Sequence, residues 1–452
     1  MAPEAFPMSK PNVLFLVVDS LRYDVATGNW ESATPTIDRL LDEGVHFQNC
    51  FAQGISTAPS MTAILTGRHP LDYGGHWYLD DDQRTFAQVF RDGGYYTGAI
   101  HSNPYVSARR NFDRGFDHFA EDVVAFEPDE GLEGLPDKLL RLASRASRIL
   151  SRTPYTPAEE VNTDILSFVD DADTPWFLWT QYMDVHGPYL GGDNFSYRNK
   201  FRAEWLWRKA AVRDPDSITE AEHEELRENY RREVEYLDSE IGNLLGELDE
   251  RGHLDDTFVV LTADHGDEFY EHGRYGHGNL PYDELTHVPL VIRPPSGSDI
   301  PRGETVDDLV RCIDILPTII DAVDAEIPTQ HRERLAGKSL LPLVRGKKRD
   351  EEPVVVTEKR VRGEKHLRIG LRTTRWKYLY DGVEDERFLY NLENDPGETT
   401  DVSQTETTVA EEFETRLRER LNQIEETSEN VVVPDVETDA GVEERLKALG
   451  YK

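Results

Sequence analysis

The segment TFVVLTADHGDEFYEHGRYGHG, which begins at Thr257, contains side chains of the types that bind metal ions. It opens with β-branched and apolar residues, which indicate a buried strand. Asp264 and His265 follow side by side, and a loop with further glycines adds Asp267, Glu268, Glu271, His272 and His277. Carboxylate and imidazole groups at the carboxyl end of a strand suit a divalent cation, because such loops line the crevice of an open α/β sheet. The alternative interpretation is an acidic loop exposed to solvent.

A second carboxylate follows another apolar run near the start of the chain. The run NVLFLVV, from Asn12 to Val18, predicts a central parallel strand, and Asp19 comes directly after it. An isolated aspartate at this point would be interpreted as a cap on the turn. Because Asp19 is one of two strand ends that carry carboxylates, we interpret it as a candidate ligand beside Asp264.

Thr57 stands where a helix is expected to begin. The sequence STAPS places a hydroxyl residue just ahead of a proline, and apolar residues follow. A helix amino terminus presents unpaired N–H groups that stabilise an anion, and Thr57 would point its hydroxyl at that anion. Thr57 could also serve only as a helix cap. A hydroxyl is a weak nucleophile until a metal lowers its pKa, so a chemical role for Thr57 requires Asp19, Asp264 and His265 to converge near it.

The elements that must position these residues alternate between strand-like and helical patterns. Such alternation predicts an α/β fold with a large, mostly parallel sheet flanked by helices. We expect a catalytic domain over residues 10–345, a small antiparallel sheet with a helix over residues 346–424, and an acidic tail over residues 425–452. Further strands are predicted at residues 45–51, 175–182, 288–292, 354–358, 367–371 and 376–380, and helices at residues 35–44, 159–170, 218–251, 310–322 and 409–423.

The chain is strongly acidic along its whole length. Its 452 residues include 50 Lys and Arg against 87 Asp and Glu, a formal net charge of −37. Such a surface repels nucleic acid and anionic lipid, so neither is an expected partner. Spread-out acidity is typical of proteins that stay soluble in concentrated salt, and we therefore expect a halophilic source. The net charge says little about the substrate, because a metal ion and a few basic side chains can attract an anion locally.

Cysteine usage and hydropathy indicate a cytoplasmic protein. Cys50 and Cys312 occur in different apolar contexts and offer neither a disulfide framework nor a thiolate metal site. The first residues, MAPEAFPMSKPN, lack a basic region followed by an apolar run, and no stretch approaches the length of an integral membrane segment. The sequence does not indicate an oligomeric state.

Three of these segments together resemble the sulfatase family within the alkaline phosphatase superfamily. They are NVLFLVVDS, TAPSMTAILTGR and VVLTADHGDEFYEHG. MDVHGPY, which contains His186, is similar to the family's His-x-Pro-Tyr segment, and RFLYNLENDPGETTD resembles its carboxyl-terminal signature. Because several ordered motifs agree over roughly residues 10 to 402, the chain is identified as a member. The resemblance implies an alkaline-phosphatase-like sandwich and a phosphoric or sulfuric ester hydrolase.

The departures from the family pattern concern the reacting groups. Sulfatases of the usual kind carry a cysteine or serine, oxidised to formylglycine, at the position of Thr57, and an arginine at the position of Met61. A threonine has no route to that aldehyde hydrate. Ser20 replaces an expected aspartate, His265 an asparagine and His277 a lysine. These changes resemble the threonine-nucleophile members of the superfamily, such as lipoteichoic acid synthase and phosphoethanolamine transferases, which act on phosphodiesters.

The same resemblance implies further substrate contacts. The segment AIHSNPYVSARRNFDRGFD is similar to the synthase, in which a histidine and an arginine contact the phosphate. His101 and either Arg109 or Arg110 would fill those roles here. His186 matches the family's substrate-contacting histidine.

Between residues 120 and 160 the resemblance lapses. Basic residues recur at helical spacing among leucines from Lys138 to Arg152, which predicts a basic amphipathic helix in this helical insertion. The helix could dock on a membrane or an acidic partner. We favour a helix packed over the mouth of the active site, where it would shape the substrate pocket.

These observations predict a metal-dependent hydrolase of a small anionic ester, most plausibly a phosphodiester. Asp19, Asp264 and His265 would hold a divalent cation, with Thr57 as a further ligand and as the nucleophile that forms a phosphothreonine. His186 and His277 would contact the substrate oxygens and protonate the leaving group, or ligate a second metal. Mixed carboxylate and imidazole donors favour zinc or manganese over calcium or magnesium.

Three other functions are compatible with the sequence. The enzyme could cleave sulfate esters without formylglycine, since both reactions expel an alkoxide from a tetrahedral oxyanion. It could be a phosphotransferase that passes the group to a sugar or lipid alcohol. It could also be an inactive binding protein with a decayed site, for which Ser20 and Met61 are the best support.

Overall fold

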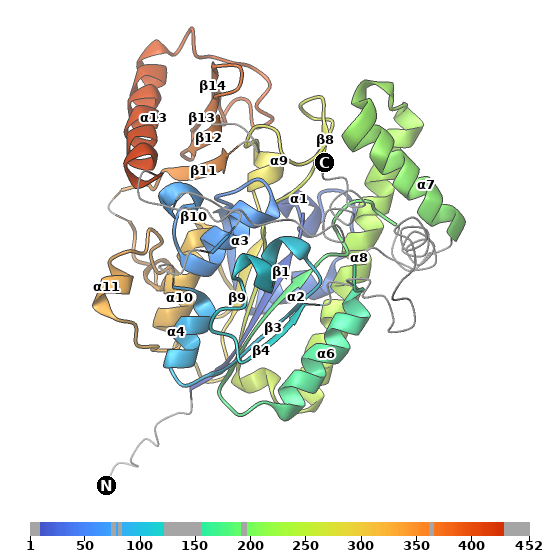
Figure 1. Ribbon diagram of the computed structural model, residues 1–452, viewed down its shortest axis with the longest axis vertical. Helices are drawn as coiled ribbons and strands as arrows, with labels where there is room; N and C mark the ends of the chain where they lie inside the picture. Colours follow the sequence, from blue (N-terminus) through green and yellow to red (C-terminus); the bar gives the residue numbers. More distant parts are fainter. Residues whose placement is uncertain are drawn as a thin grey trace, which may run out of the picture.

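The computed structural model describes residues 10–73, 78–79, 84–121, 155–190, 197–349, 351–360 and 366–428. Within them, a large mixed sheet forms the centre of the molecule, and helices cover both of its faces (Figure 1). The strand order is β10-β2-β9-β6-β1-β5-β3-β4. The strands are β1 (Asn12–Val18), β2 (Val45–Phe51), β3 (Tyr96–His101), β4 (His118–Glu121), β5 (Trp176–Tyr182), β6 (Thr257–Ala263), β9 (Leu290–Arg293) and β10 (Glu304–Arg311).

Strand β1 lies in the middle of this sheet and is buried along its whole length. It pairs in parallel with β5 on one side and with β6 on the other. Strand β9 runs antiparallel to both β6 and β2, so the sheet is mostly but not entirely parallel. The near-continuous apolar sequences of β1, β5 and β6 follow from this position, because helices cover both faces of the central strands.

The helices form two layers. Figure 1 shows α2 (Pro35–Glu43), α6 (Ala158–Asp171) and the long α8 (Glu220–Glu250) on one side of the sheet. The opposite side carries α3 (Thr57–Thr66), α4 (Phe86–Asp92) and α10 (Ile315–Ala322). Shorter or peripheral helices are α1 (Tyr23–Ala26), α7 (Tyr197–Trp207), α9 (Asp283–Thr286), α11 (Thr329–Arg332) and α12 (Leu341–Val344).

A second, smaller unit follows near the carboxyl end. Strands β11 (Val355–Arg360), β12 (Leu367–Arg372), β13 (Trp376–Asp381) and β14 (Glu386–Asn391) form an antiparallel sheet in sequence order. Helix α13 (Thr407–Ser428) packs against it through a cluster that includes Ile369, Leu389 and Phe413. The two-stranded hairpin β7 (Glu268–Phe269) and β8 (Tyr275–Gly276) belongs to the segment that follows β6.

One predicted helix begins later than expected, and some observed strands have no counterpart among the predicted elements. The helix predicted at residues 310–322 begins at Ile315, because Val310 and Arg311 extend β10 and pair with β2. The sequence analysis does not predict β3, β4, β10 or β14 as strands. The basic helix at residues 138–152 and the tail after residue 428 lie outside the described residues. None of the described helices is both long and apolar enough to cross a membrane.

Candidate active site

The two strand ends that carry carboxylates lie side by side. Strands β1 and β6 pair in register up to Val18 and Ala263, so the next residues, Asp19 and Asp264, emerge together at the same edge of the sheet. Both side chains are fully buried, as is that of His265. The backbone N–H of Ser20 donates to Asp264 Oδ1 at 3.2 Å, and the Ser20 hydroxyl donates to Asp19 Oδ1 at 3.0 Å.

Thr57 joins this pair from helix α3. It is the first residue of the helix, and its Oγ1 donates a hydrogen bond of 3.0 Å to Asp19 Oδ2. Ser56, not Thr57, occupies the N-cap position, and the Ser56 side chain makes no capping hydrogen bond. The first turn of α3 therefore begins beside Asp19 with amide groups that the Ser56 side chain does not cap, as the anion-binding interpretation requires.

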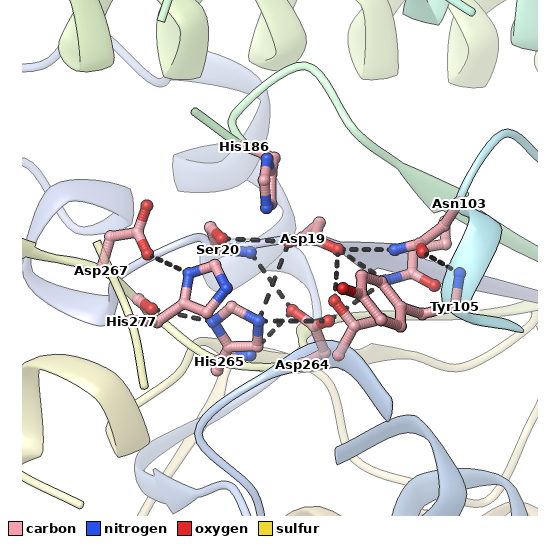
Figure 2. A network of polar contacts seen from close by, with 12 residues as sticks. Asp19, Ser20, Asn103, Tyr105, His186, Asp264, His265, Asp267 and His277 are labelled. Atoms are coloured by element: carbon pink, nitrogen blue, oxygen red, sulfur yellow. Dashed lines mark hydrogen bonds and ion pairs between the residues drawn. The ribbon is translucent and has the colours of Figure 1, made fainter. Parts of the chain in front are cut away.

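Two amide side chains complete the surroundings of the carboxylates, and the sequence analysis missed both. Asn103 Nδ2 donates to Asp19 Oδ2 at 2.8 Å (Figure 2). Gln181 Nε2 donates to Asp19 Oδ2 and to Asp264 Oδ2, each at 3.1 Å. Gln181 is a buried polar residue in a strand rich in aromatic residues, which was the available signal. Its role depends on the register that pairs it with Val17 of β1.

Burial and mutual repulsion shape the charges of this cluster. Burial, and then the nearby carboxylate of Asp19, raise the pKa of Asp264 well above its usual value. Burial, and then the neighbouring His277, lower the pKa of His265 to about 4. An imidazole in this environment is neutral at neutral pH, whereas two adjacent buried carboxylates call for a proton or a cation between them.

Three histidines present the same face to the site. His265 Nδ1 lies 2.9 Å from Gly266 O, and His186 Nδ1 lies 2.6 Å from Gly187 O. His277 Nδ1 lies 2.7 Å from Asp267 Oδ1. Because carbonyl and carboxylate oxygens only accept, a neutral ring must carry its proton on Nδ1, which leaves Nε2 as the lone-pair donor. Figure 2 shows these rings gathered beside Asp19, on the side away from Asn103.

This donor set fits a divalent cation. One ligand atom from each of Asp19, Asp264 and His265 lies within 4.8 Å of the other two. His265 Nε2 has no hydrogen-bond partner among the described residues and stands 3.7 Å from Asp264 Oδ2 and 3.9 Å from Asp19 Oδ1. The lone pair of this buried imidazole points toward two carboxylates, and no proton lies between them. A bound cation would satisfy all three groups. His265, Asp267 and His277 form a second such group.

The three predicted phosphate contacts lie around the site without joining its centre. His101 ends β3 with its ring packed against Trp179, and burial lowers its pKa to about 3. His101 Nδ1 accepts from the backbone N–H of Asn103, so His101 supports the loop that carries the Asn103 side chain. Arg110 is buried with its guanidinium 5.0 Å from the Tyr105 ring centre, and Arg109 is exposed.

A mostly parallel sheet whose strand ends collect carboxylates, imidazoles and a hydroxyl suits an ester hydrolase and includes a cluster that could hold a metal ion. The chain belongs to the sulfatase family, whose model matches residues 11–325, well over half of its length. A second family model, described as the carboxyl-terminal part of N-sulphoglucosamine sulphohydrolase, matches residues 270–427.

Individual relatives agree with this assignment. The chain is 25% identical to an arylsulfatase of Clostridium perfringens, over 88% of this chain and 91% of the relative. It is 26% identical to arylsulfatase K of Gallus gallus, over 87% and 79% of the two chains. Among solved structures, the phosphonate monoester hydrolase of Agrobacterium radiobacter superposes with a TM-score of 0.70 at 20% identity, over 92% of this chain and 96% of that one. A putative sulfatase from Bacteroides thetaiotaomicron gives 0.71 at 20% identity, over 94% and 95%.

Proposed function

We propose that this sulfatase-family hydrolase cleaves phosphate esters, with phosphodiesters preferred, and that Thr57 is its nucleophile. The observation that carries the proposal is the 3.0 Å hydrogen bond from Thr57 Oγ1 to Asp19 at the amino terminus of α3. The nucleophile position thus holds an intact hydroxyl within the candidate metal cluster. A threonine side chain cannot supply the aldehyde hydrate on which the usual sulfatase mechanism depends.

The chain's own residues prepare Thr57 for attack. Asp19 accepts the hydroxyl proton in a hydrogen bond and thereby directs an oxygen lone pair away from the carboxylate. Asn103 and Gln181 donate to the same Asp19 oxygen as Thr57 and hold that carboxylate in place. The α3 amino terminus favours negative charge on a transferring phosphoryl group, and the near-complete burial of Thr57 excludes bulk water. Attack by Oγ1 on phosphorus expels one alkoxide of the diester, which takes up the proton lost from Oγ1, and leaves the phosphoryl group on Thr57 with its second ester still attached; water then cleaves the bond to Thr57 and releases a phosphate monoester.

The cluster would hold its cation through Asp19, Asp264, His265 and the oxygen of Thr57. When bound, such a cation lowers the pKa of a hydroxyl and neutralises charge on the reacting group. Members of the sulfatase family depend on a metal, typically calcium or magnesium. The mixed oxygen and nitrogen donors of this chain favour zinc or manganese instead, because calcium and magnesium prefer shells made of oxygen.

His186 and His277 face the substrate from the far side of the cluster. Asp267 accepts from His277 Nδ1, and Tyr189 donates to the other oxygen of Asp267 at 2.6 Å. A carboxylate at Nδ1 fixes the imidazole and strengthens the basicity of Nε2. Burial, and then the neighbouring His186, nevertheless lower the pKa of His277 to about 3. The neutral ring is therefore better suited to ligate a second cation than to donate a proton from the resting enzyme.

Sulfate ester hydrolysis is the second candidate function. It is favoured by the names of the relatives, which include arylsulfatases that align with most of this chain. The same cluster could stabilise the loss of an alkoxide from sulfur, with a sulfothreonine in place of the phosphothreonine. The two functions share their residues and differ only in the ester that is turned over fastest.

The deciding experiment compares matched aryl phosphodiester, phosphate monoester and sulfate ester substrates in high salt with added zinc or manganese. We expect the phosphodiester to be hydrolysed fastest, Thr57→Ala to lose at least about 10³-fold in kcat, and Thr57→Ser to keep measurable activity. A preference for the sulfate ester would replace the first function with the second. Full activity in Thr57→Ala would contradict both.

A further inference from the structure

A cationic side chain from the carboxyl-terminal sheet lies next to the loop that carries His277. Lys359, in β11, donates from Nζ to the carbonyl oxygen of Gly278 at 3.1 Å. Arg368, in β12, donates from Nη1 to the same oxygen at 3.2 Å. Gly278 directly follows His277, and Lys359 is near enough to lower the pKa of that histidine. Two positive charges therefore meet beside the imidazole that faces the substrate.

The charge of Lys359 is not matched by a carboxylate among the described residues. Lys359 and Arg368 are direct partners in the antiparallel pair of β11 and β12, where like charges destabilise a sheet. Arg368 is compensated by Asp381, 3.2 Å away. The hydrogen-bond partner of Lys359 is the uncharged backbone carbonyl of Gly278. Burial, and then the adjacent Arg368, lower the pKa of Lys359 to about 8, as expected for a cation with no counter-charge.

Lys359 differs in its partners from Lys377, another lysine of the carboxyl-terminal sheet. The chain carries 87 acidic residues against 50 basic ones, so carboxylates are abundant. Lys377, on the neighbouring strand β13, contacts both Asp283 and Glu398. Lys359 as a whole is partly exposed. A partly exposed lysine beside the site, with no carboxylate partner among the described residues, is a candidate binding position for an anion.

We propose that Lys359, supported by Arg368, binds an anionic group that the substrate carries in addition to its reacting ester. The group is a carboxylate, sulfate or phosphate on the part of the substrate that lies beyond His277. The identity of the reacting ester rests on the function proposed above, whereas the binding of the second anion does not. The competing explanation is that Lys359 only ties the carboxyl-terminal sheet to the catalytic loop through Gly278.

Equilibrium binding of two unreactive probes tests the proposal whether or not any ester is hydrolysed. Phenylphosphonate and 4-carboxyphenylphosphonate share the phosphonate and differ in a second anionic group. We expect the carboxylated probe to bind the metal-loaded native protein about tenfold more tightly by calorimetry, a difference of about 1.4 kcal/mol. Lys359→Gln should abolish that advantage, while Lys359→Arg should retain most of it.

The control makes the same charge change elsewhere. Lys347→Gln removes an exposed lysine that follows α12 and should leave the advantage of the carboxylated probe intact. Glutamine at position 359 can still donate to Gly278, so a purely structural tie would leave the binding ratio of the two probes unchanged. Equal binding of both probes by the native protein, or an unchanged ratio in Lys359→Gln, overturns the proposal. Absence of esterase activity would count only against the proposed function.

Discussion

At the scale of single residues, the site combines a hydroxyl, two carboxylates and three imidazoles, and every residue of this set except the partly buried His277 is buried. Asp19 is the common partner of Thr57, Asn103 and Gln181, all of which donate to its Oδ2. Its other oxygen accepts from Ser20 and faces His265. One carboxylate thus fixes both the nucleophile and the candidate metal ligands, which is why its neighbours matter as much as the ligands themselves.

Gln181 provides a test of this arrangement. Replacing Gln181 with leucine removes the donor shared by Asp19 and Asp264 and leaves their mutual repulsion uncompensated. We expect affinity for zinc or manganese to fall by about 10- to 100-fold, as for other residues that orient ligands. Metal titration followed by calorimetry measures the change. Thr180→Ser is the control, because Thr180 donates to Ile100 O and not to the site. Unaltered affinity in Gln181→Leu would show that the amide does not organise the carboxylates.

The sequence predicted the ligands better than the residues that orient them. Asp19 and Asp264 could be placed together because both follow apolar strands whose carboxyl ends share one edge of a parallel sheet. Thr57 could be placed near them only because a helix start binds anions. Asn103 and Gln181 escaped prediction, because their roles depend on strand register and loop shape, which no local pattern encodes. The roles predicted for His101, Arg109 and Arg110 stay predictions.

At the scale of elements, helix α7 supports the loops that carry two of the histidines. Trp207 packs against Gly187 and Gly276, and a Cβ at either glycine would stand 2.5 Å or 3.1 Å from its ring. Gly187 follows His186, and Gly276 precedes His277. The close approach allows a large buried ring to wedge between the two loops. The positive φ of 78° at Gly276 adds a conformational reason for glycine there.

Truncation of this ring should affect stability and activity together. We expect Trp207→Ala to reduce the free energy of unfolding by about 3–5 kcal/mol and to lower kcat, because the loops around His186 and His277 lose their support. Trp205→Ala on the same helix is the control: Trp205 is 44% exposed, and its loss should change stability by no more than about 0.5 kcal/mol. Denaturant unfolding and steady-state kinetics measure both effects. Loss of stability without loss of activity would show that Trp207 does not support the loops that carry His186 and His277.

At the scale of the whole molecule, Asp283 connects the catalytic region to the carboxyl-terminal sheet. It opens helix α9, and its carboxylate contacts Lys377 Nζ at 2.6 Å and Arg372 Nη2 at 3.2 Å. Burial would raise the pKa of Asp283, but Arg372 and Lys377 outweigh it and hold that pKa well below the usual 3.8. The unfolded chain therefore binds this proton more readily than the folded protein does.

The sign of the pH dependence follows from this shift. The stabilisation from Asp283 is fully present above the ordinary aspartate pKa and is lost as the pH falls below it. We expect Asp283→Asn to be less stable at neutral pH and to lose less further stability on acidification than the native protein. Asp299→Asn, at a surface pair with Arg345, is the control. Parallel stability curves for native protein and Asp283→Asn, measured by urea unfolding from pH 7 downward, would contradict the assignment.

The net charge of −37 leads to a prediction about salt. Repulsion among the excess carboxylates opposes the compact state at low ionic strength, and salt screens it. We expect the thermal unfolding midpoint to rise continuously as potassium chloride increases from about 0.1 M to about 3 M. Sucrose at matched water activity serves as the uncharged control. A midpoint that does not respond to potassium chloride would argue against adaptation to concentrated salt.

The nucleophile is the centre of this account, and a covalent intermediate tests it most directly. The metal-loaded protein is mixed with an aryl phosphodiester, quenched in acid within a single turnover, digested and sequenced by mass spectrometry. We predict an adduct on Thr57 in the peptide that contains TAPSMTAILTGR, a phosphoryl group that still carries the second ester group of the substrate; it should be absent from Thr57→Ala, and residue 57 should otherwise be an unmodified threonine. Turnover without an adduct, or an adduct on a different residue, would contradict the threonine mechanism.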